Sequence, residues 1–171
     1  MSQSVPVPRA FLIADDHPMV RDALSTGLAQ AFAGAALATA ASLAEVQAAL
    51  DRQPDTDALL LDLDMPGMDG LTGLALLRAQ HPTVPIIVVS AARDSTVVRR
   101  THELGASAYV DKSAPLEEIA RMVRAVLAGE IFAPPPAEGG DTLAQRAAQL
   151  TPQQWRVLAL MVQGDQNKQI A

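Results

Sequence analysis

The twelve residues from Leu59 to Gly70, LLLDLDMPGMDG, constrain the fold more than any other stretch of the chain. An apolar run at Ala58–Leu61 leads directly to Asp62, and turn residues follow at positions 65–67. An uninterrupted apolar run that ends in a turn is typical of a strand buried on both faces, as in parallel sheets. Open α/β sheets bind ligands at the carboxyl ends of such strands, which makes Asp62 a candidate functional residue. A strand that merely ends in a turn-forming aspartate has the same pattern, so only the rest of the chain can show whether Asp62 is functional.

Four other apolar runs alternate with helical patterns along residues 10–127. The predicted strands are Ala10–Ala14, Ala36–Ala40, Ala58–Leu61, 86–89 and 108–110. The predicted helices follow these strands in turn, at 18–33, 43–50, 71–79, 94–104 and 115–127. Right-handed crossovers convert this alternation into a parallel sheet with helices on both faces. The expected fold class is therefore α/β, a doubly wound, flavodoxin-like sheet of five parallel strands in the order 2-1-3-4-5.

Polar side chains stand at the ends of four predicted strands. In chain order these residues are Asp15, Asp16, Asp62, Ser90 and Lys112. In the predicted strand order the switch point lies between strands one and three, so these groups meet at one edge of the sheet. One such group could arise by chance, whereas four strand ends that deliver polar groups to one edge indicate a common site.

The expected site has the groups that phosphoryl transfer needs. Three carboxylates about 5 Å apart, at an effective dielectric constant near 20, repel by roughly 3 kcal/mol for each pair. Mg²⁺ relieves this repulsion, because it prefers oxygen ligands and binds one or two carboxylates together with phosphate oxygens. A lysine and a hydroxyl would hold the other phosphoryl oxygens, and a carboxylate in line would accept the group. The product would be an acyl phosphate on Asp62.

With these residues, positions 9–130 resemble the receiver domain of two-component response regulators. The matching pieces are the acid pair at 15–16, Asp62 within LLLDLDMPGMDG, Ser90 after IIVV, and Lys112 three residues after Tyr109. The resemblance implies that a partner sensor histidine kinase phosphorylates Asp62 with Mg²⁺ as the cofactor. It also implies that the domain is not an enzyme for other substrates and catalyses only its own phosphorylation and dephosphorylation.

The resemblance gives the other site residues their roles. The expected Mg²⁺ ligands are oxygens, from Asp15, Asp16, Asp62 and the backbone carbonyl of Asp64. Ser90 would contact the phosphoryl group, and Lys112 would form an ion pair with its oxygens. Ser90 and Tyr109 would be the switch that reports phosphorylation to the face formed by the fourth helix, fifth strand and fifth helix. Asp64 and Ala92 occupy positions that in the family modulate the lifetime of the phosphoryl group.

Each residue also has a plainer explanation when it is taken alone. Asp16 would more often be a helix N-cap and Ser90 a turn residue. Lys112 would be solvated, and Tyr109 would pack in a short edge strand. These explanations fail together, because the spacing suits a receiver at every position. The methionines Met19, Met65 and Met68 are interpreted as packing or loop residues. The three histidines, His17, His81 and His102, are assigned no chemistry.

Two rival functions remain open at this point. The segment 62–64, Asp-Leu-Asp, resembles the nucleophile and acid of haloacid-dehalogenase-type phosphohydrolases, which also use a Ser or Thr, a Lys and Mg²⁺. That family places its D-x-D on the first strand with the acid pair later, and it has Thr or Val where Pro66 stands here. The other rival is a receiver-like interaction module that is never phosphorylated, and the complete set of acidic residues argues against it.

A second part of the chain begins after residue 130. Prolines at 134–136 and glycines at 139–140 indicate a linker over residues 131–150. Residues 151–154, Thr-Pro-Gln-Gln, form a predicted capping box with Pro152 at the first helical position. Leu150 and Trp155 are placed for the hydrophobic staple that often accompanies such a box.

The stretch LTPQQWRVLALMVQGDQNKQIA is similar to the start of the LuxR-type helix-turn-helix domain of NarL/FixJ regulators. Asp165 and Gln166 depart from the family, which usually has an apolar residue and a Ser or Thr there. Residues 151–171 hold neither the turn nor the recognition helix, so this output domain is expected to be truncated. DNA contact is expected only through the missing part.

Composition limits the partners. The absence of cysteine excludes disulfides and thiolate metal sites. No apolar run approaches the roughly 20 residues of a membrane span, and the N-terminus lacks a signal-peptide core. A cytoplasmic protein without a membrane partner is therefore expected. The net charge is −6, and residues 131–171 have 3 basic and 3 acidic residues, so neither part has a basic footprint for nucleic acid. A homodimer formed on phosphorylation is the remaining partner that the resemblance allows.

Overall fold

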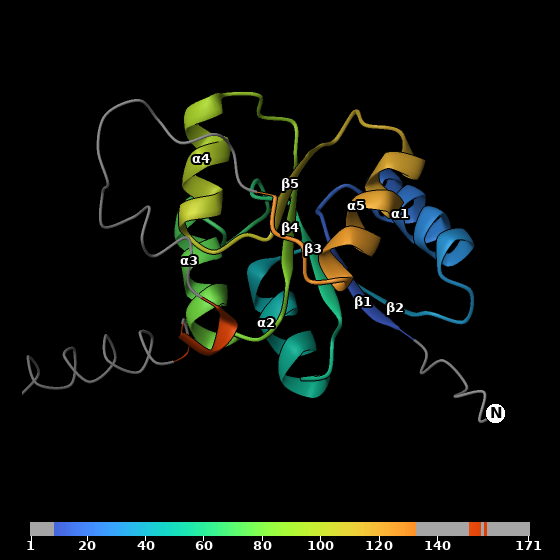
Figure 1. Cartoon of the computed structure of the whole chain (residues 1–171), viewed down its shortest axis with the longest axis horizontal. Helices are drawn as coiled ribbons and strands as arrows, with labels where there is room; N and C mark the ends of the chain where they lie inside the picture. The colour runs from blue at the N-terminus through green and yellow to red at the C-terminus, as the bar shows by residue number, and fades with distance from the viewer. Residues whose placement is uncertain (1–8, 133–150, 155, 157–171) are drawn as a thin grey trace, which may run out of the picture.

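A sheet of five parallel strands organises the chain (Figure 1). The structure is a computed structural model, and it describes residues 9–132, 151–154 and 156. The strands are β1 (Ala10–Ala14), β2 (Ala36–Ala40), β3 (Ala58–Leu61), β4 (Ile86–Ser90) and β5 (Ala108–Asp111). Their order across the sheet is β2-β1-β3-β4-β5, and every neighbouring pair is parallel. The predicted fold class and strand order are confirmed.

Helices cover both faces of this sheet (Figure 1). They are α1 (Pro18–Ala31), α2 (Leu43–Arg52), α3 (Leu71–Gln80), α4 (Ser95–Glu103) and α5 (Leu116–Leu127). The helices α1 and α5 lie on one face, and α2, α3 and α4 lie on the other. Within the described ranges, no helix has the length and apolar character that crossing a membrane requires.

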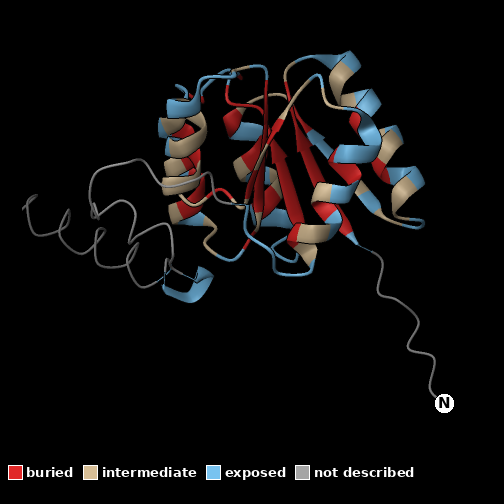
Figure 2. Cartoon of the chain, turned by 45° about the horizontal axis from the view of Figure 1, so that its top comes forward, coloured by how far each residue is buried: buried red, intermediate tan, exposed pale blue. Residues whose placement is uncertain are grey.

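Alternate residues of the central strands contribute to two separate cores. In β1, Leu12 and Ala14 belong to the core under α2 and α3, whereas Phe11 and Ile13 belong to the core under α1 and α5. The strands β1, β3 and β4 are buried along their whole length (Figure 2). Because both of their faces are covered, these strands appear in the sequence as uninterrupted apolar runs. The edge strand β2 is largely exposed, which accounts for its weaker apolar pattern.

The helix α1 ends at Ala31, earlier than the predicted stop at Gly34. Phe32 leaves the helix and packs edge-to-face on Phe11 of β1, with ring centroids 5.0 Å apart. The Arg124 guanidinium of α5 lies 5.3 Å from the centroid of the Phe32 ring and donates a 3.1 Å hydrogen bond to the Ala31 carbonyl. Tertiary packing of one aromatic ring therefore ends the helix before its glycine.

Helix starts follow the sequence more closely. The Ser42 hydroxyl accepts a hydrogen bond from the Glu45 backbone N–H at 3.2 Å, and the Glu45 carboxylate accepts one from the Ala41 N–H at 2.7 Å. The capping box predicted at 42–45 is therefore confirmed. The helix α4 begins one residue later than predicted, because Asp94 is its N-cap and accepts from the Thr96 N–H at 2.8 Å.

The second predicted capping box is also confirmed. The Gln154 N–H donates to the Thr151 hydroxyl at 3.3 Å, and the Thr151 N–H donates to the Gln154 side-chain oxygen at 2.8 Å. Residues 133–150 of the linker predicted at 131–150, and the Trp155 side chain of the predicted hydrophobic staple, lie outside the described residues.

Candidate functional site

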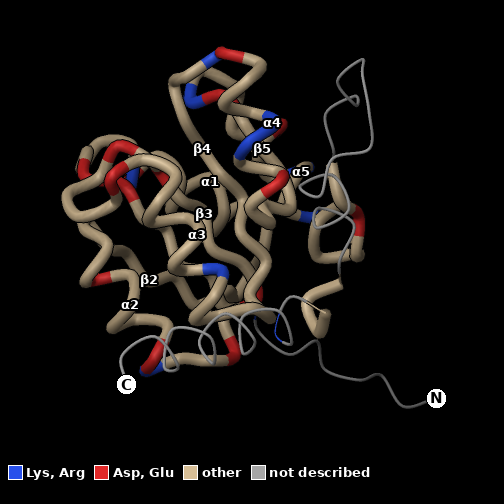
Figure 3. Tube along the Cα trace, turned by 90° about the vertical axis from the view of Figure 1, so that its left-hand side faces the viewer, with Lys and Arg blue, Asp and Glu red and all other residues tan. Residues whose placement is uncertain are grey.

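The backbone brings the polar strand ends to one edge of the sheet. Parallel pairing continues one step beyond the strands, because the Asp62 N–H donates to the Ala14 carbonyl at 2.9 Å and the Lys112 N–H donates to the Ser90 carbonyl at 3.0 Å. The Asp15 N–H likewise donates to the Ala40 carbonyl at 3.0 Å. Acidic positions gather in the loops at one end of the sheet (Figure 3). The predicted convergence of four strand ends is present in the structure.

Lys112 bridges two of the predicted acids. Its Nζ lies 2.9 Å from Asp15 Oδ2 and 3.1 Å from Asp62 Oδ2. Both carboxylates are almost completely buried, and the lysine side chain is 17% exposed. We call Asp15, Asp16 and Asp62 the acidic cluster. Part of the repulsion expected within this cluster is thus offset by a cation that the protein supplies.

Burial and Lys112 shift the pKa values of these groups in different directions. Burial raises the pKa of Asp62, and the hydrogen bond from the Asp64 N–H and the contact with Lys112 offset only part of that rise. Burial also acts to raise the pKa of Asp15, but hydrogen bonds from Lys112 and His17 outweigh it and hold that pKa below its usual value. The same two acids raise the pKa of Lys112 although burial opposes them. Asp15 and Lys112 therefore form the firm ion pair, and Asp62 is the less stabilised anion.

The turn after β3 fixes one oxygen of Asp62. The Asp64 N–H donates to Asp62 Oδ1 at 3.2 Å, and the Asp64 side chain points outward and is exposed. Further along the turn, Gly70 has a φ of +60°, a conformation that favours glycine. Met65 and Met68 are buried, which confirms their interpretation as packing residues, whereas Met19 is exposed on α1, so that interpretation is wrong for it. The backbone thus fixes Oδ1 of Asp62, and Oδ2 is directed toward the Lys112 ammonium.

The two predicted switch residues meet at Ala92. The Ser90 hydroxyl is buried and accepts a hydrogen bond from the Ala92 N–H at 3.2 Å. The Tyr109 hydroxyl donates to the Ala92 carbonyl. The side chains of Ser90 and Tyr109 are therefore linked through the backbone of one residue, Ala92, beside the acidic cluster. Tyr109 is half-buried and also packs against the core under α2 and α3, as its plainer explanation expected.

Asp16 belongs to the site and not to the end of the helix. The N-cap of α1 is His17, whose side chain makes no capping hydrogen bond, so the plainer explanation of Asp16 as an N-cap is wrong. Four ligand atoms, one each from Asp15, Asp16, His17 and Asp62, lie within 4.8 Å of one another. Asp16 Oδ1 and Asp62 Oδ2 are buried and accept no well-aligned hydrogen bond from the described residues. Their near contacts are ionic, with His17 Nδ1 at 3.0 Å and Lys112 Nζ at 3.1 Å, and buried carboxylate oxygens of this kind suit a hard divalent cation.

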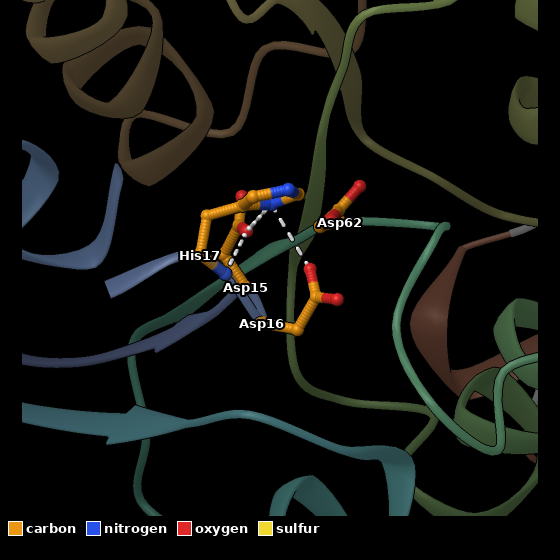
Figure 4. A group of neighbouring side chains, drawn as sticks. All are labelled: Asp15, Asp16, His17 and Asp62. Atoms are coloured by element: carbon orange, nitrogen blue, oxygen red, sulfur yellow. Dashed lines mark hydrogen bonds and ion pairs between the residues drawn. The ribbon is translucent and has the colours of Figure 1, made fainter. Parts of the chain in front are cut away.

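His17 is the site residue that sequence reasoning missed. Its Nδ1 lies 2.9 Å from Asp15 Oδ1 and 3.0 Å from Asp16 Oδ1, as the dashed lines in Figure 4 show. The available signal was its place directly after the acid pair, with Pro18 fixing the start of the next helix. His81 and His102 take no part in this cluster.

Comparison with known proteins identifies the family. Residues 11–124 match the response regulator receiver domain. The chain belongs to the response regulators. Among curated relatives, the glycerol metabolism activator of Pseudomonas putida is 35% identical over 174 residues, which cover 94% of this chain and 79% of the relative. The nitrate/nitrite response regulator protein NarL of Escherichia coli is 35% identical over 176 residues, covering 96% and 80% of the two chains.

A solved structure supports the same assignment. The LuxR-family two-component response regulator from Aurantimonas is 28% identical, with a TM-score of 0.66, and the match covers 73% of this chain and 89% of that one. The resemblance to a receiver of the NarL/LuxR class is therefore confirmed. This response regulator acts in phosphorelay signalling and transcription control. The matches give no support to the phosphohydrolase alternative.

Proposed function

We propose that Asp62 is the phosphoacceptor of this response regulator and that a sensor histidine kinase is the donor. The observation that carries the proposal is the position of Asp62, a buried carboxylate whose Oδ2 lies 3.1 Å from the Lys112 ammonium. One Asp62 oxygen would form the new bond to phosphorus as the bond from phosphorus to the donor's histidine nitrogen breaks. Because Asp62 is buried, its carboxylate is poorly solvated. Poor solvation raises the pKa of Asp62 and makes the carboxylate more reactive toward an electrophilic phosphorus.

The acidic cluster is the proposed Mg²⁺ site. Asp15, Asp16 and Asp62 would supply carboxylate oxygens, and the backbone carbonyl of Asp64 would complete the protein ligands. Bound Mg²⁺ would neutralise charge on the phosphoryl oxygens and orient the group for in-line transfer. Lys112 would pair with another phosphoryl oxygen, leaving its contact with Asp62. The support for this role is the pair of buried oxygens on Asp16 and Asp62, which accept no well-aligned hydrogen bond from the described residues and have ionic contacts with His17 and Lys112.

The contacts of Ala92 suggest how phosphorylation is reported. The Ser90 hydroxyl would leave the Ala92 N–H to bind a phosphoryl oxygen, and the intervening peptide would move with it. Tyr109, whose hydroxyl is bonded to the Ala92 carbonyl, would follow and change the surface formed by α4, β5 and α5. A homodimer through that surface is the proposed consequence. Asp64 and Ala92 flank the site, and we propose that they modulate the lifetime of the phosphoryl group.

The proposal extends to the organisation of the chain. Residues 9–130 would be the receiver, 131–150 the linker, and 151–171 the start of a LuxR-type helix-turn-helix. The confirmed capping box at 151–154 supports a helix start at that position. Specific DNA binding would need a recognition helix in the major groove. Transcription control would act through such a helix of the output domain.

Phosphorylation by a small donor tests the proposal. With Mg²⁺ and acetyl phosphate, intact-mass spectrometry should show one added phosphoryl group, and Asp62→Asn should show none. Asp69→Asn is the matched control, because its carboxylate lies further along the same loop, is exposed and has no proposed role at the site; it should still be labelled. Undiminished labelling of Asp62→Asn would refute the assignment. Many turnovers of a phosphomonoester would instead support a phosphohydrolase.

A further inference from the structure

The His17 ring is positioned by the acidic cluster and not by core packing. Its backbone N–H donates to Asp15 Oδ1 at 2.8 Å, and Pro18 begins α1 immediately afterwards, so the local backbone is fixed. The side chain is 62% exposed, yet its Nδ1 turns inward to lie 2.9 Å from Asp15 Oδ1 and 3.0 Å from Asp16 Oδ1 (Figure 4). The contacts that direct the ring are therefore those with the two carboxylates.

A hydrogen bond accounts for only part of this arrangement. The single proton that Nδ1 can carry lies on the line to one oxygen and cannot serve two equally well. A metal ion can bind Nδ1 and both oxygens at once. Neighbouring ligand atoms of an octahedral ion with bonds of about 2.1 Å are about 3.0 Å apart. Both distances from His17 Nδ1 are close to that value.

Lys112 leaves room for such an ion. It contacts Asp15 through Oδ2, whereas His17 contacts the same carboxylate through Oδ1. Asp62 is fully buried, and its Oδ2 accepts no well-aligned hydrogen bond from the described residues although the Lys112 ammonium lies 3.1 Å away. The imidazole and the three carboxylates together offer four ligand atoms within 4.8 Å of one another.

We propose that His17 Nδ1 is a direct ligand of the metal held by the acidic cluster and that it shifts the preference of this site from Mg²⁺ toward borderline transition ions such as Co²⁺, Ni²⁺ and Zn²⁺. Imidazole nitrogen suits these ions, whereas Mg²⁺ prefers oxygen ligands and water. The inference rests on the proposed metal-binding function of the cluster. It adds that this response regulator is sensitive to which divalent ion is present.

Calorimetric titration with CoCl₂ and with MgCl₂ tests the inference at about pH 8, where most imidazoles are uncharged. Oxygen-only sites also bind Co²⁺ more tightly than Mg²⁺, so the informative quantity is the change in the ratio of the two affinities. His17→Asn should lower the Co²⁺ affinity by roughly 10-fold or more, since even partners of metal ligands contribute that much. Its Mg²⁺ affinity should change by less than about 2-fold, because the oxygen ligands remain. His81→Asn is the matched control and should leave both affinities unchanged.

The visible absorption of bound Co²⁺ gives a second readout that a structural role would not move. Loss of a nitrogen ligand should alter the absorption bands in His17→Asn and not in His81→Asn. His17→Gln repeats the test if the first variant melts at a lower temperature. An unchanged affinity ratio together with an unchanged spectrum would overturn the inference while leaving the proposed function intact. Failure of the unaltered protein to bind either ion would overturn the metal-binding role itself.

Discussion

Replacement of Lys112 by methionine should destabilise the metal-free protein more than any other single change at the site. The substitution keeps most of the aliphatic chain and removes the ammonium that lies 2.9 Å from Asp15 Oδ2 and 3.1 Å from Asp62 Oδ2. The buried carboxylates of Asp15 and Asp62 would then repel each other and the nearby Asp16 carboxylate, because the Lys112 ammonium between Asp15 and Asp62 is gone. The free energy of unfolding should fall because the charges remain buried while their partner is lost.

The contacts set the size of the effect. At an effective dielectric constant near 20, each ion pair contributes on the order of 5 kcal/mol of attraction, most of which offsets the cost of burying the charges. Removing one partner of a buried pair costs roughly 3–5 kcal/mol. Since Lys112 is 17% exposed, water screens part of the interaction, and about 3 kcal/mol is the better expectation. In a chain of 171 residues, that loss lowers Tm by roughly 6–12 °C.

Thermal melts of four proteins in a chelator provide the assay: the unaltered chain, Lys112→Met, Asp62→Asn and the double variant. Asp62→Asn alone should be neutral or stabilising, because burial raises the pKa of Asp62 and thus disfavours its charged form. Added to Lys112→Met, it should recover part of the lost Tm, since one unpaired charge is gone. A Lys112→Met protein that melts within about 1 °C of the unaltered chain would refute the claim that Lys112 balances these acids.

Three further outcomes are expected. Asp16→Asn should reduce the rise in Tm on Mg²⁺ addition, because one proposed ligand is lost; an unchanged rise would exclude Asp16 from the metal site. Gly73→Ala should destabilise the protein by about 1–3 kcal/mol in urea melts, because an added Cβ would lie 2.6 Å from the Met68 carbonyl oxygen. Gly27→Ala is the control and should be tolerated, because its Cβ would meet only the flexible Leu116 side chain, at 3.3 Å. Burial lowers the pKa of His102 below 6.5, so the unfolded state binds the extra proton first, and stability should fall as the pH drops below about 6.5. His102→Asn should show a smaller fall than the unaltered chain in the same series of melts.

The sequence was sufficient to predict the sheet and the residues at its carboxyl edge. Uninterrupted apolar runs at β1, β3 and β4 identify strands covered on both faces, and parallel pairing then brings their ends together. Asp62 and Lys112 could be placed in one site because each directly follows a strand, and strand ends are fixed by backbone hydrogen bonds. Regular backbone hydrogen bonding between strands positions these residues, and the apolar runs in the sequence show where the strands lie.

Side-chain geometry at the site could not be predicted in the same way. Lys112 has a long, flexible chain, and nothing local indicated that its Nζ would bridge two carboxylates. His17 was assigned no chemistry, because its position at the start of α1 suggested only a helix boundary; its contacts with the acids depend on the ring orientation. The early end of α1 has a similar origin, since Phe32 finds its partner on β1. Each case depends on a contact between residues that local patterns do not relate.

The charges of the site explain why metal and phosphoryl group should bind together. Three carboxylates and one lysine leave a net charge of about −2 when all are ionised, and a phosphoryl group is also dianionic near neutral pH. A divalent cation brings the site to neutrality, so that an incoming anion is no longer repelled. Lys112 then has two successive tasks: it stabilises Asp15 and Asp62 before transfer and would pair with a phosphoryl oxygen afterwards. The stability of the unmodified receiver and the proposed chemistry of its phosphorylation would therefore depend on the same ammonium group.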